Sequence, residues 1–232
     1  MPARTKLTMY EEILLLALDD EKGTTDMSGM HDLAMGGAIL AELMLLGAVH
    51  IDDDKKKLAN AEPGAQVGDP LLAECLALMQ QAKRRKKGAE WVQKFAGLKS
   101  LKNRVARGLV SKGVLNESHD KVLGLFTRTI FPARDGGPEQ DLIARLNEAV
   151  LTDTDRLEPR TVIVTVLAQA TSLLERAIPK KQLKPRKARL KQLAEGQAAA
   201  GATAAAIAAV QATQAAVMVA IVAATAATSA SS

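Results

Sequence analysis

A cluster of basic side chains between Lys83 and Lys112 is the part of this sequence best suited to bind a ligand. The segment holds eleven Lys or Arg and a single acid, Glu90. Cationic side chains attract phosphate and carboxylate groups by charge and by hydrogen bonding. The expected ligands are therefore anions: phospholipid headgroups, nucleic acid or a soluble anion.

The second half of this cluster has the spacing of an amphipathic helix, with one apolar stripe and one basic arc. The apolar stripe consists of Leu98, Leu101, Val105 and Leu109. The opposite arc consists of Lys99, Asn103, Arg104 and Arg107, with Lys102 at its edge. We therefore expect one face of this helix to pack on the protein and the other to present cations.

The charge of the chain is unevenly distributed along its length. Residues 1–54 hold eleven acids against three bases, although the whole chain has a net charge of +5. A second basic block covers residues 176–191, where eight Lys or Arg occur without an acid. Pro179 and Pro185 predict a loop in this block, which either lies against a bilayer or stays solvated. We interpret the run Lys83–Lys87 as a flexible surface loop.

Length and composition favour one globular domain. A chain of 232 residues with 47% apolar content can bury a sizeable core. We expect a single domain over residues 1–232, with 1–6 and 226–232 frayed. Cys75 is the only cysteine, which excludes an intramolecular disulfide, fits a reducing cytosolic setting and predicts a buried structural thiol. The N-terminus lacks the long apolar segment of a secretion signal.

Periodicity and capping residues predict a mainly α fold. Thr8 with Glu11 forms a capping box, and Asp69 with Pro70 forms a second helix start. We expect a helical bundle with surrounding amphipathic helices and one or two short β-hairpins. The expected helices cover about 9–20, 32–46, 70–82, 90–95, 98–109, 138–150 and 161–170, and the expected strand segments cover 48–51 and 121–131. The helix expected at 161–170 is apolar on nearly every side and is predicted to lie at the bundle centre.

The C-terminal region is rich in Ala and has no charged residue after Glu195. Its larger apolar side chains follow helical spacing, with Gln211 and Gln214 between them. We expect a helix that packs closely on the bundle through small residues, because Ala, Thr and Gln partition weakly into a bilayer.

Five segments of this chain resemble the Golgi phosphoprotein family in order and approximate spacing. They are 8–18, 37–47, 68–74, 109–115 and 162–174, and the resemblance extends from about Leu7 to Ala224. It implies a single-domain, mainly helical cytosolic protein that binds phosphatidylinositol 4-phosphate on Golgi membranes and helps to retain glycosyltransferases. The prediction is a prokaryotic member of this family.

The resemblance also implies a lipid-headgroup pocket, which the eukaryotic relatives build from one Trp and three Arg. Met27 stands at the Trp position, Gly36 at the first Arg position, and Lys99 and Lys102 at the other two. We therefore expect headgroup binding by Lys99, Lys102, Arg104 and Arg107, with Met27 and Gly36 beside them. Lys holds phosphate as a point charge without the two-pronged geometry of Arg, so strict selectivity for phosphatidylinositol 4-phosphate is not expected.

The family inserts an apolar hairpin into the membrane beside that pocket. The corresponding side chains here are Leu123, Leu125 and Phe126. Each basic residue near an acidic surface contributes about 1 kcal/mol, and a buried apolar tip adds its transfer free energy. The first hypothesis is thus a peripheral adaptor on the cytosolic face of an anionic membrane, with possible membrane-protein clients.

Two other functions remain as alternatives. The chain repeats a pattern of helix, Gly turn and strand at 45–49 and 109–115, and two such units resemble winged-helix modules that bind nucleic acid. An aromatic content of 2% makes nucleic acid an unlikely partner. The other alternative is a non-catalytic module that forms homo-oligomers. We expect no enzyme activity, metal or cofactor, since no phosphate loop, nucleophile elbow or metal-ligand spacing occurs.

Overall fold

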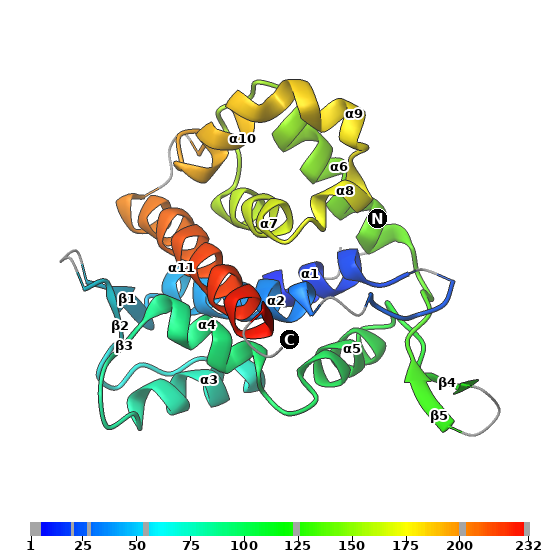
Figure 1. The fold of residues 1–232 in the computed structure, drawn as a ribbon, viewed down its shortest axis with the longest axis horizontal. Coiled ribbons are helices and arrows are strands. Elements are labelled where there is room, and N and C mark those ends of the chain that lie inside the picture. The colour runs from blue at the N-terminus through cyan, green and yellow to red at the C-terminus, as the bar shows by residue number, and fades with distance from the viewer. Residues whose placement is uncertain are drawn as a thin grey trace.

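The structure is a computed structural model that describes residues 6–19, 21–26, 29–52, 56–122, 126–199 and 203–229. It is mainly α-helical with two small antiparallel sheets, which confirms the predicted fold class. Figure 1 shows one group of helices around α2 and another, α6 and α8 to α10, around α7, with the β4–β5 hairpin projecting from one side. Of the termini predicted to fray, 1–5 and 230–232 lie outside the described residues, and the last helix continues to Ser229.

The first half of the chain contains five helices and three strands among its described residues. In chain order they are α1 (Met9–Ala17), α2 (Met30–Leu45), β1 (Val49–Ile51), β2 (Leu58–Ala61), α3 (Pro70–Gln80), β3 (Lys86–Lys87), α4 (Gly88–Ala96) and α5 (Leu101–Ser111). The antiparallel sheet has the order β1-β2-β3.

The second half begins with a separate hairpin and continues in helices. Its elements are β4 (Ser118–Val122), β5 (Phe126–Ile130), α6 (Gly137–Leu151), α7 (Pro159–Ala170), α8 (Leu174–Ala177), α9 (Lys180–Leu183), the 3-10 turn η1 (Lys184–Arg186), α10 (Lys187–Ala194) and α11 (Ala204–Ser229).

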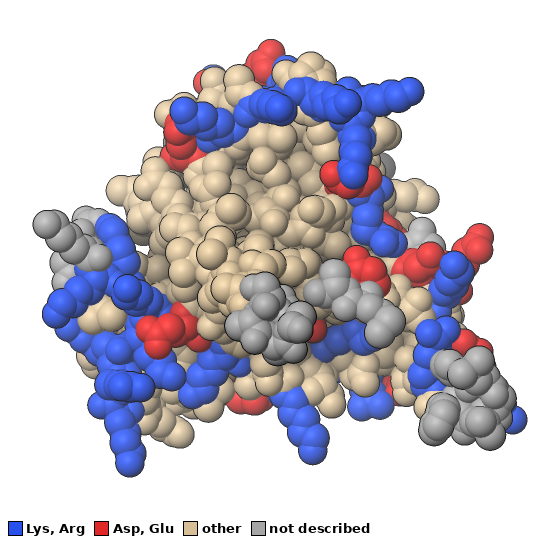
Figure 2. All heavy atoms as spheres, in the orientation of Figure 1, with Lys and Arg blue, Asp and Glu red and all other residues tan. Residues whose placement is uncertain are grey.

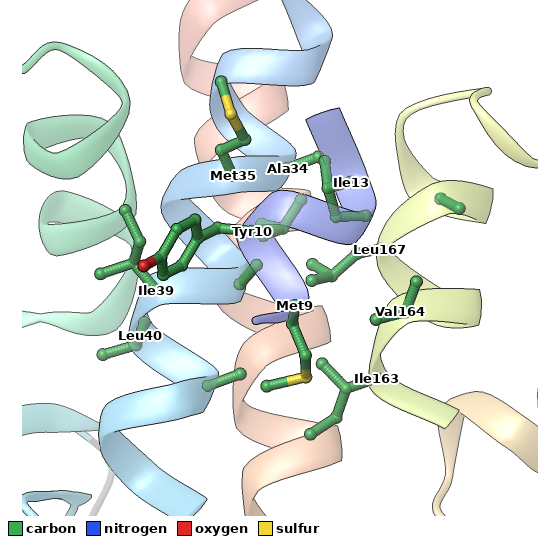
Figure 3. Close-up of a cluster of buried hydrophobic side chains, with 14 of the residues drawn as sticks. Met9, Tyr10, Ile13, Ala34, Met35, Ile39, Leu40, Ile163, Val164 and Leu167 are labelled. Atoms are coloured by element: carbon green, nitrogen blue, oxygen red, sulfur yellow. The ribbon is translucent and has the colours of Figure 1, made fainter. Parts of the chain in front are cut away.

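Helix α2 lies at the centre of the core, because it packs on α1, α4, α7 and α11. It is apolar on nearly every side, as a helix with neighbours all round must be. Figure 3 shows apolar side chains of α1, α2 and α7 meeting in one cluster. Helix α7 is also buried along most of its length, as predicted, and it packs on α1, α2, α6, α8, α10 and α11.

Two ion pairs cross this core and join elements that are far apart in sequence. Glu42 of α2 accepts two hydrogen bonds from Arg160 of α7, at 2.6 and 2.7 Å, and its side chain is only 4% exposed. Glu12 of α1 pairs with Arg145 of α6 at 2.5 Å. Burial raises the pKa of Glu12, although both arginines oppose this shift. These pairs fix the relative positions of α1, α2, α6 and α7.

The predicted repeat appears as two helix ends with the same backbone geometry. At the end of α2, Ala48 N donates to Leu43 O, and Gly47 has a φ of 68°. At the end of α5, Val114 N donates to Leu109 O, and Gly113 has a φ of 75°. Both are left-handed glycine caps that turn the chain into a following strand.

The basic block 176–191 is helical, so the loop predicted from its prolines is wrong. Pro179 precedes α9 and Pro185 lies in the first residues of η1, where a missing N–H breaks no helical hydrogen bond. Arg189 Nε donates to Ala149 O at 2.9 Å, and Arg186 Nε donates to Val150 O at 2.6 Å. These two arginines therefore bind the C-terminal carbonyls of α6 and hold the block in place.

Part of the run Lys83–Lys87 is also ordered, which corrects the prediction of a flexible loop. Lys86 and Lys87 form β3 and pair with Ala59 and Leu58 of β2. The ammonium of Lys86 lies 5.5 Å from the ring centroid of Trp91, close enough for a cation–π contact.

The apolar C-terminal helix packs on the bundle as predicted. Small side chains of α11, such as Ala209, Ala216 and Ala220, are buried against α2, α4 and α7. Its outer side exposes Met218, Val219 and Val222. Within the described part of the chain, Ala204–Ala226 is the stretch whose length and composition would suffice to cross a membrane.

Cys75 is expected to resist thiol reagents in the folded protein. The residue is fully buried in α3, and burial raises the pKa of its thiol to about 12. At pH 8 almost no thiolate forms, so labelling by a thiol-disulfide reagent should become rapid only after unfolding in urea. Rapid labelling of the native protein at one equivalent would contradict the buried structural role.

Candidate lipid-headgroup site

The basic helix α5 packs through one face, as its periodicity predicts. Leu101, Val105 and Leu109 are buried, and this face lies against α1. The polar face points to solvent and begins at Ser100, which adopts a left-handed conformation with a φ of 54°. Ser100 and the first turn of α5 lie at the edge of a cavity. The free N–H groups at the start of a helix favour the binding of anions.

This cavity has a volume of about 410 Å³ and lies between three segments that are distant in sequence. Helix α5 and the turn before it contribute Ser100, Lys102 and Asn103. Asp32 enters from the first turn of α2, and Arg128 with Thr129 enters from β5. Among the described residues that line it, the charged ones are two cations and one carboxylate. The site therefore combines a positive potential with several hydrogen-bonding groups.

Lys102 is the predicted headgroup residue that lines this cavity. None of the ion pairs among the described residues engages its ammonium, so the charge remains available. Its positive charge helps to lower the pKa of His31, although burial is the main cause of that shift. Burial also raises the pKa of Asp32, and the charges of His31 and Lys102 oppose this shift. Lys102 thus acts on both titratable groups at the start of α2.

Arg128 supplies the second cation, which was not among the predicted headgroup residues. The residue lies opposite Asp120 in the β4–β5 register, and its Nη2 donates to Asp120 Oδ2 at 2.9 Å. About half of the Arg128 side chain is exposed. The pair orients the guanidinium beside the cavity and leaves other donors of the group unused.

Arg104 and Arg107 do not line this cavity, and both bind carboxylates. Arg104 forms two hydrogen bonds with Glu74 of α3, one of them at 3.2 Å. Arg107 binds both oxygens of Glu117, with its Nη2 at 3.0 Å. These hydrogen bonds lower the pKa of each glutamate. The two arginines attach α5 to its neighbours rather than presenting free charge.

The other predicted headgroup residues are not brought together at the cavity. Lys99 is exposed in the turn before α5 and does not line it. Gly36 is buried where α2 touches α4, and a Cβ there would overlap the carbonyl oxygen of Val92. The helices approach this closely because position 36 has no side chain. Met27 lies outside the described residues.

The hairpin beside the cavity has a firmly attached base. Phe131 is buried, and its N–H donates to Gly23 O at 2.9 Å. Asn116, which precedes β4, donates its backbone N–H to the carbonyl oxygen of Pro132, which follows β5, at 2.9 Å. The strands pair from Ser118 opposite Ile130 to Val122 opposite Phe126. Of the predicted inserting residues, Leu123, Leu125 and the side chain of Phe126 lie outside the described part.

Other candidate sites in the described residues are less suited to an anion. A larger cavity, about 910 Å³, lies between α1, α6 and α7 and mixes acids with bases, among them Glu12, Asp141 and Arg145. The described residues include no group of three or more side chains placed to hold a metal ion. Figure 2 shows one face of the molecule, with Lys and Arg around its rim and a broad uncharged area over α11 and α7.

Sequence comparison identifies relatives of this chain. The sequence pattern of the family described as Golgi phosphoprotein 3 (GPP34) matches residues 9–212, a range that includes both the cavity and the hairpin. The chain is also similar to vacuolar protein sorting-associated protein 74 of Eremothecium gossypii, with 30% identity over 166 residues. That alignment covers 60% of this chain and 48% of the relative, so it spans about half of the longer protein. The chain belongs to the Golgi phosphoprotein 3 (GPP34) family.

Proposed function

We propose that this protein is a peripheral membrane adaptor, not an enzyme, which docks on the anionic cytosolic face of a membrane. The headgroup enters the cavity between α2, α5 and β5, and the tip of the β4–β5 hairpin enters the apolar layer. The observation that carries this proposal is that Lys102 and Arg128 line one cavity along strand β5 of that hairpin. Family membership supports it, because the resemblance implies phosphoinositide binding.

The spacing between the cavity and the hairpin tip suits simultaneous contact with headgroup and acyl chains. Phe126, the first residue of β5, lies two positions before Arg128, which corresponds to about 7 Å of extended chain. Apolar side chains of interfacial proteins enter the boundary between headgroups and acyl chains by a similar depth. A phosphate held by Arg128 is therefore compatible with an inserted tip.

The energies of the two contacts explain why both are needed. A cation close to an acidic surface contributes about 1 kcal/mol, so Lys102 and Arg128 together supply about 2 kcal/mol. That value corresponds to about a thirtyfold change in affinity, which alone gives weak attachment. Burial of apolar side chains at the hairpin tip adds its transfer free energy, and the combined contact remains reversible.

Removal of the two cavity cations should sharply weaken vesicle binding. The variant Lys102→Gln with Arg128→Gln is expected to bind vesicles of phosphatidylcholine with phosphatidylglycerol or phosphatidylinositol 4-phosphate about thirtyfold more weakly. Co-sedimentation at physiological salt measures this change. The matched control is Lys181→Gln with Lys184→Gln, two exposed cations of the α9–η1 segment for which the described residues offer no ion pair.

The control pair should retain most of the binding, because it removes the same charge at another place. Equal losses in both variants would show that attachment follows net charge alone, which would overturn the cavity as the docking site. Wild-type protein that sediments equally with neutral and acidic vesicles would overturn membrane docking through anionic lipid.

A further inference from the structure

Asp32 gives the cavity a carboxylate in the place where the proposed function puts a lipid phosphate. Its side chain is 38% exposed and comes from the first turn of α2. The nearest ring nitrogen of His31 lies 3.6 Å from Asp32 Oδ1, which is beyond normal hydrogen-bonding distance. Both oxygens of Asp32 therefore keep lone pairs that can accept hydrogen bonds from a bound molecule.

The charge of the cavity limits the charge of its occupant. Among the residues that line the cavity, Lys102 and Arg128 against Asp32 leave a net charge of +1, and Arg128 is in addition paired with Asp120. His31, buried behind Asp32, adds no charge at neutral pH because burial lowers the pKa of its imidazole. A phosphodiester carries only one negative charge, which suits a site with so little net positive charge. A headgroup with an additional phosphomonoester carries a further charge of about −1.5 to −2, and part of this charge would lie near the Asp32 carboxylate.

The Asp32 carboxylate can also bind part of the headgroup by hydrogen bonding. Ionised carboxylates form short, strong hydrogen bonds with hydroxyl donors. A headgroup with free hydroxyl groups next to its phosphate can bind Lys102 and Arg128 through the phosphate and Asp32 through a hydroxyl. Asn103, Ser100 and Thr129 line the same cavity and can bind further hydroxyl groups.

We infer, as a refinement that rests on the proposed function, that this cavity selects a lipid headgroup with one phosphodiester and free hydroxyl groups. Phosphatidylglycerol is the simplest lipid of this class. Headgroups with further phosphate groups bind less well, because Asp32 repels them. Headgroups of equal charge without a hydrogen-bond donor, such as phosphatidylmethanol, have no group from which Asp32 can accept a hydrogen bond. The selecting residue is Asp32, and the binding cations are Lys102 and Arg128.

The test compares vesicles of phosphatidylcholine with phosphatidylglycerol, phosphatidylmethanol or phosphatidylinositol 4-phosphate at matched surface charge. Wild-type protein is expected to bind the phosphatidylglycerol vesicles most tightly. Asp32→Asn removes one negative charge while keeping the size of the side chain. It should raise the affinity for phosphatidylinositol 4-phosphate relative to phosphatidylglycerol by about five- to tenfold, as expected for removal of a nearby like charge.

The controls separate this inference from the proposed function. Asp155→Asn removes the same charge from the exposed loop before α7 and should leave the lipid preference unchanged. Asp32→Ser provides a second variant at the site, and thermal unfolding of each variant checks the fold. An Asp32 variant that keeps the wild-type preference, or wild-type preference for phosphatidylinositol 4-phosphate, would overturn the selection while membrane docking stands. Absence of wild-type binding to every acidic vesicle would overturn both.

Discussion

Replacement of Arg160 with Leu is expected to lower the free energy of unfolding by about 3–5 kcal/mol, the usual cost of leaving one partner of a buried ion pair. Arg160 donates to both oxygens of Glu42 and also to Leu7 O at 3.3 Å. Without the guanidinium, the buried Glu42 carboxylate would keep one donor, Met9 N at 2.7 Å. Urea denaturation at pH 7 measures the loss.

The matched control is Arg104→Leu, because Arg104 also pairs with a glutamate from a distant helix. Both side chains of the Arg104–Glu74 pair are exposed by about two fifths. Exposed ion pairs contribute about 0–1 kcal/mol, so the control should remain close to the wild type. The double replacement Arg160→Leu with Glu42→Leu should recover much of the stability, since it leaves no unpaired charge. Equal effects of Arg160→Leu and Arg104→Leu would contradict this account.

Replacement of Gly23 with Ala should also have a large effect, and it should weaken membrane binding as well. Gly23 has a φ of 59°, and a Cβ at this position would overlap backbone atoms of Phe131 and Pro132. A left-handed conformation costs about 1–2 kcal/mol for a residue with a Cβ, and overpacking adds about 1–3 kcal/mol. We therefore expect a loss of stability of about 2–5 kcal/mol by thermal or urea unfolding.

The position of Gly23 links this loss to function. Gly23 O accepts the hydrogen bond from Phe131 N that holds the hairpin base, so a displaced loop also displaces β5 and Arg128. Gly64→Ala is the matched control, because Gly64 has a φ of 73° with nothing within 4 Å of a Cβ. It should cost only the 1–2 kcal/mol of the left-handed conformation and leave vesicle binding unchanged. If both variants behave alike, the close contact at Phe131 does not determine the hairpin position.

Local patterns predicted most helices because local interactions form them. The capping box is present, since Glu11 accepts a hydrogen bond from Thr8 N at 2.8 Å. Asp69 caps α3 by accepting from Leu72 N at 2.9 Å. Hydrophobic spacing then fixed which face of each helix is buried. These signals lie within a few residues of the helices they define, so the sequence alone contains them.

The helical form of residues 176–191 could not be predicted because tertiary contacts support it. Prolines are read as helix breakers, but at the first positions of a helix they remove no hydrogen bond. The decisive interactions run from Arg186 and Arg189 to the end of α6, about forty residues earlier in the chain. No local periodicity reveals such partners.

The candidate site shows the same limit more strongly. Periodicity placed Lys102, Arg104 and Arg107 on the exposed side of α5, but it could not reveal that the two arginines bind Glu74 and Glu117. Asp32 and Arg128 belong to segments that only the folded chain brings to α5. The sequence thus predicted a basic helix face, and the fold determines which of its cations stand beside a cavity.

One wall of the cavity is strand β5 itself, since Arg128 and Thr129 belong to both structures. A molecule that fills the cavity therefore bridges the bundle to the hairpin, and opening the hairpin would require losing those contacts. By thermodynamic linkage, a bound molecule stabilises the closed hairpin by the same free energy by which the closed hairpin stabilises the bound molecule. Protease resistance and slowed amide exchange in β4 and β5 would then report a filled site without any direct view of the bilayer.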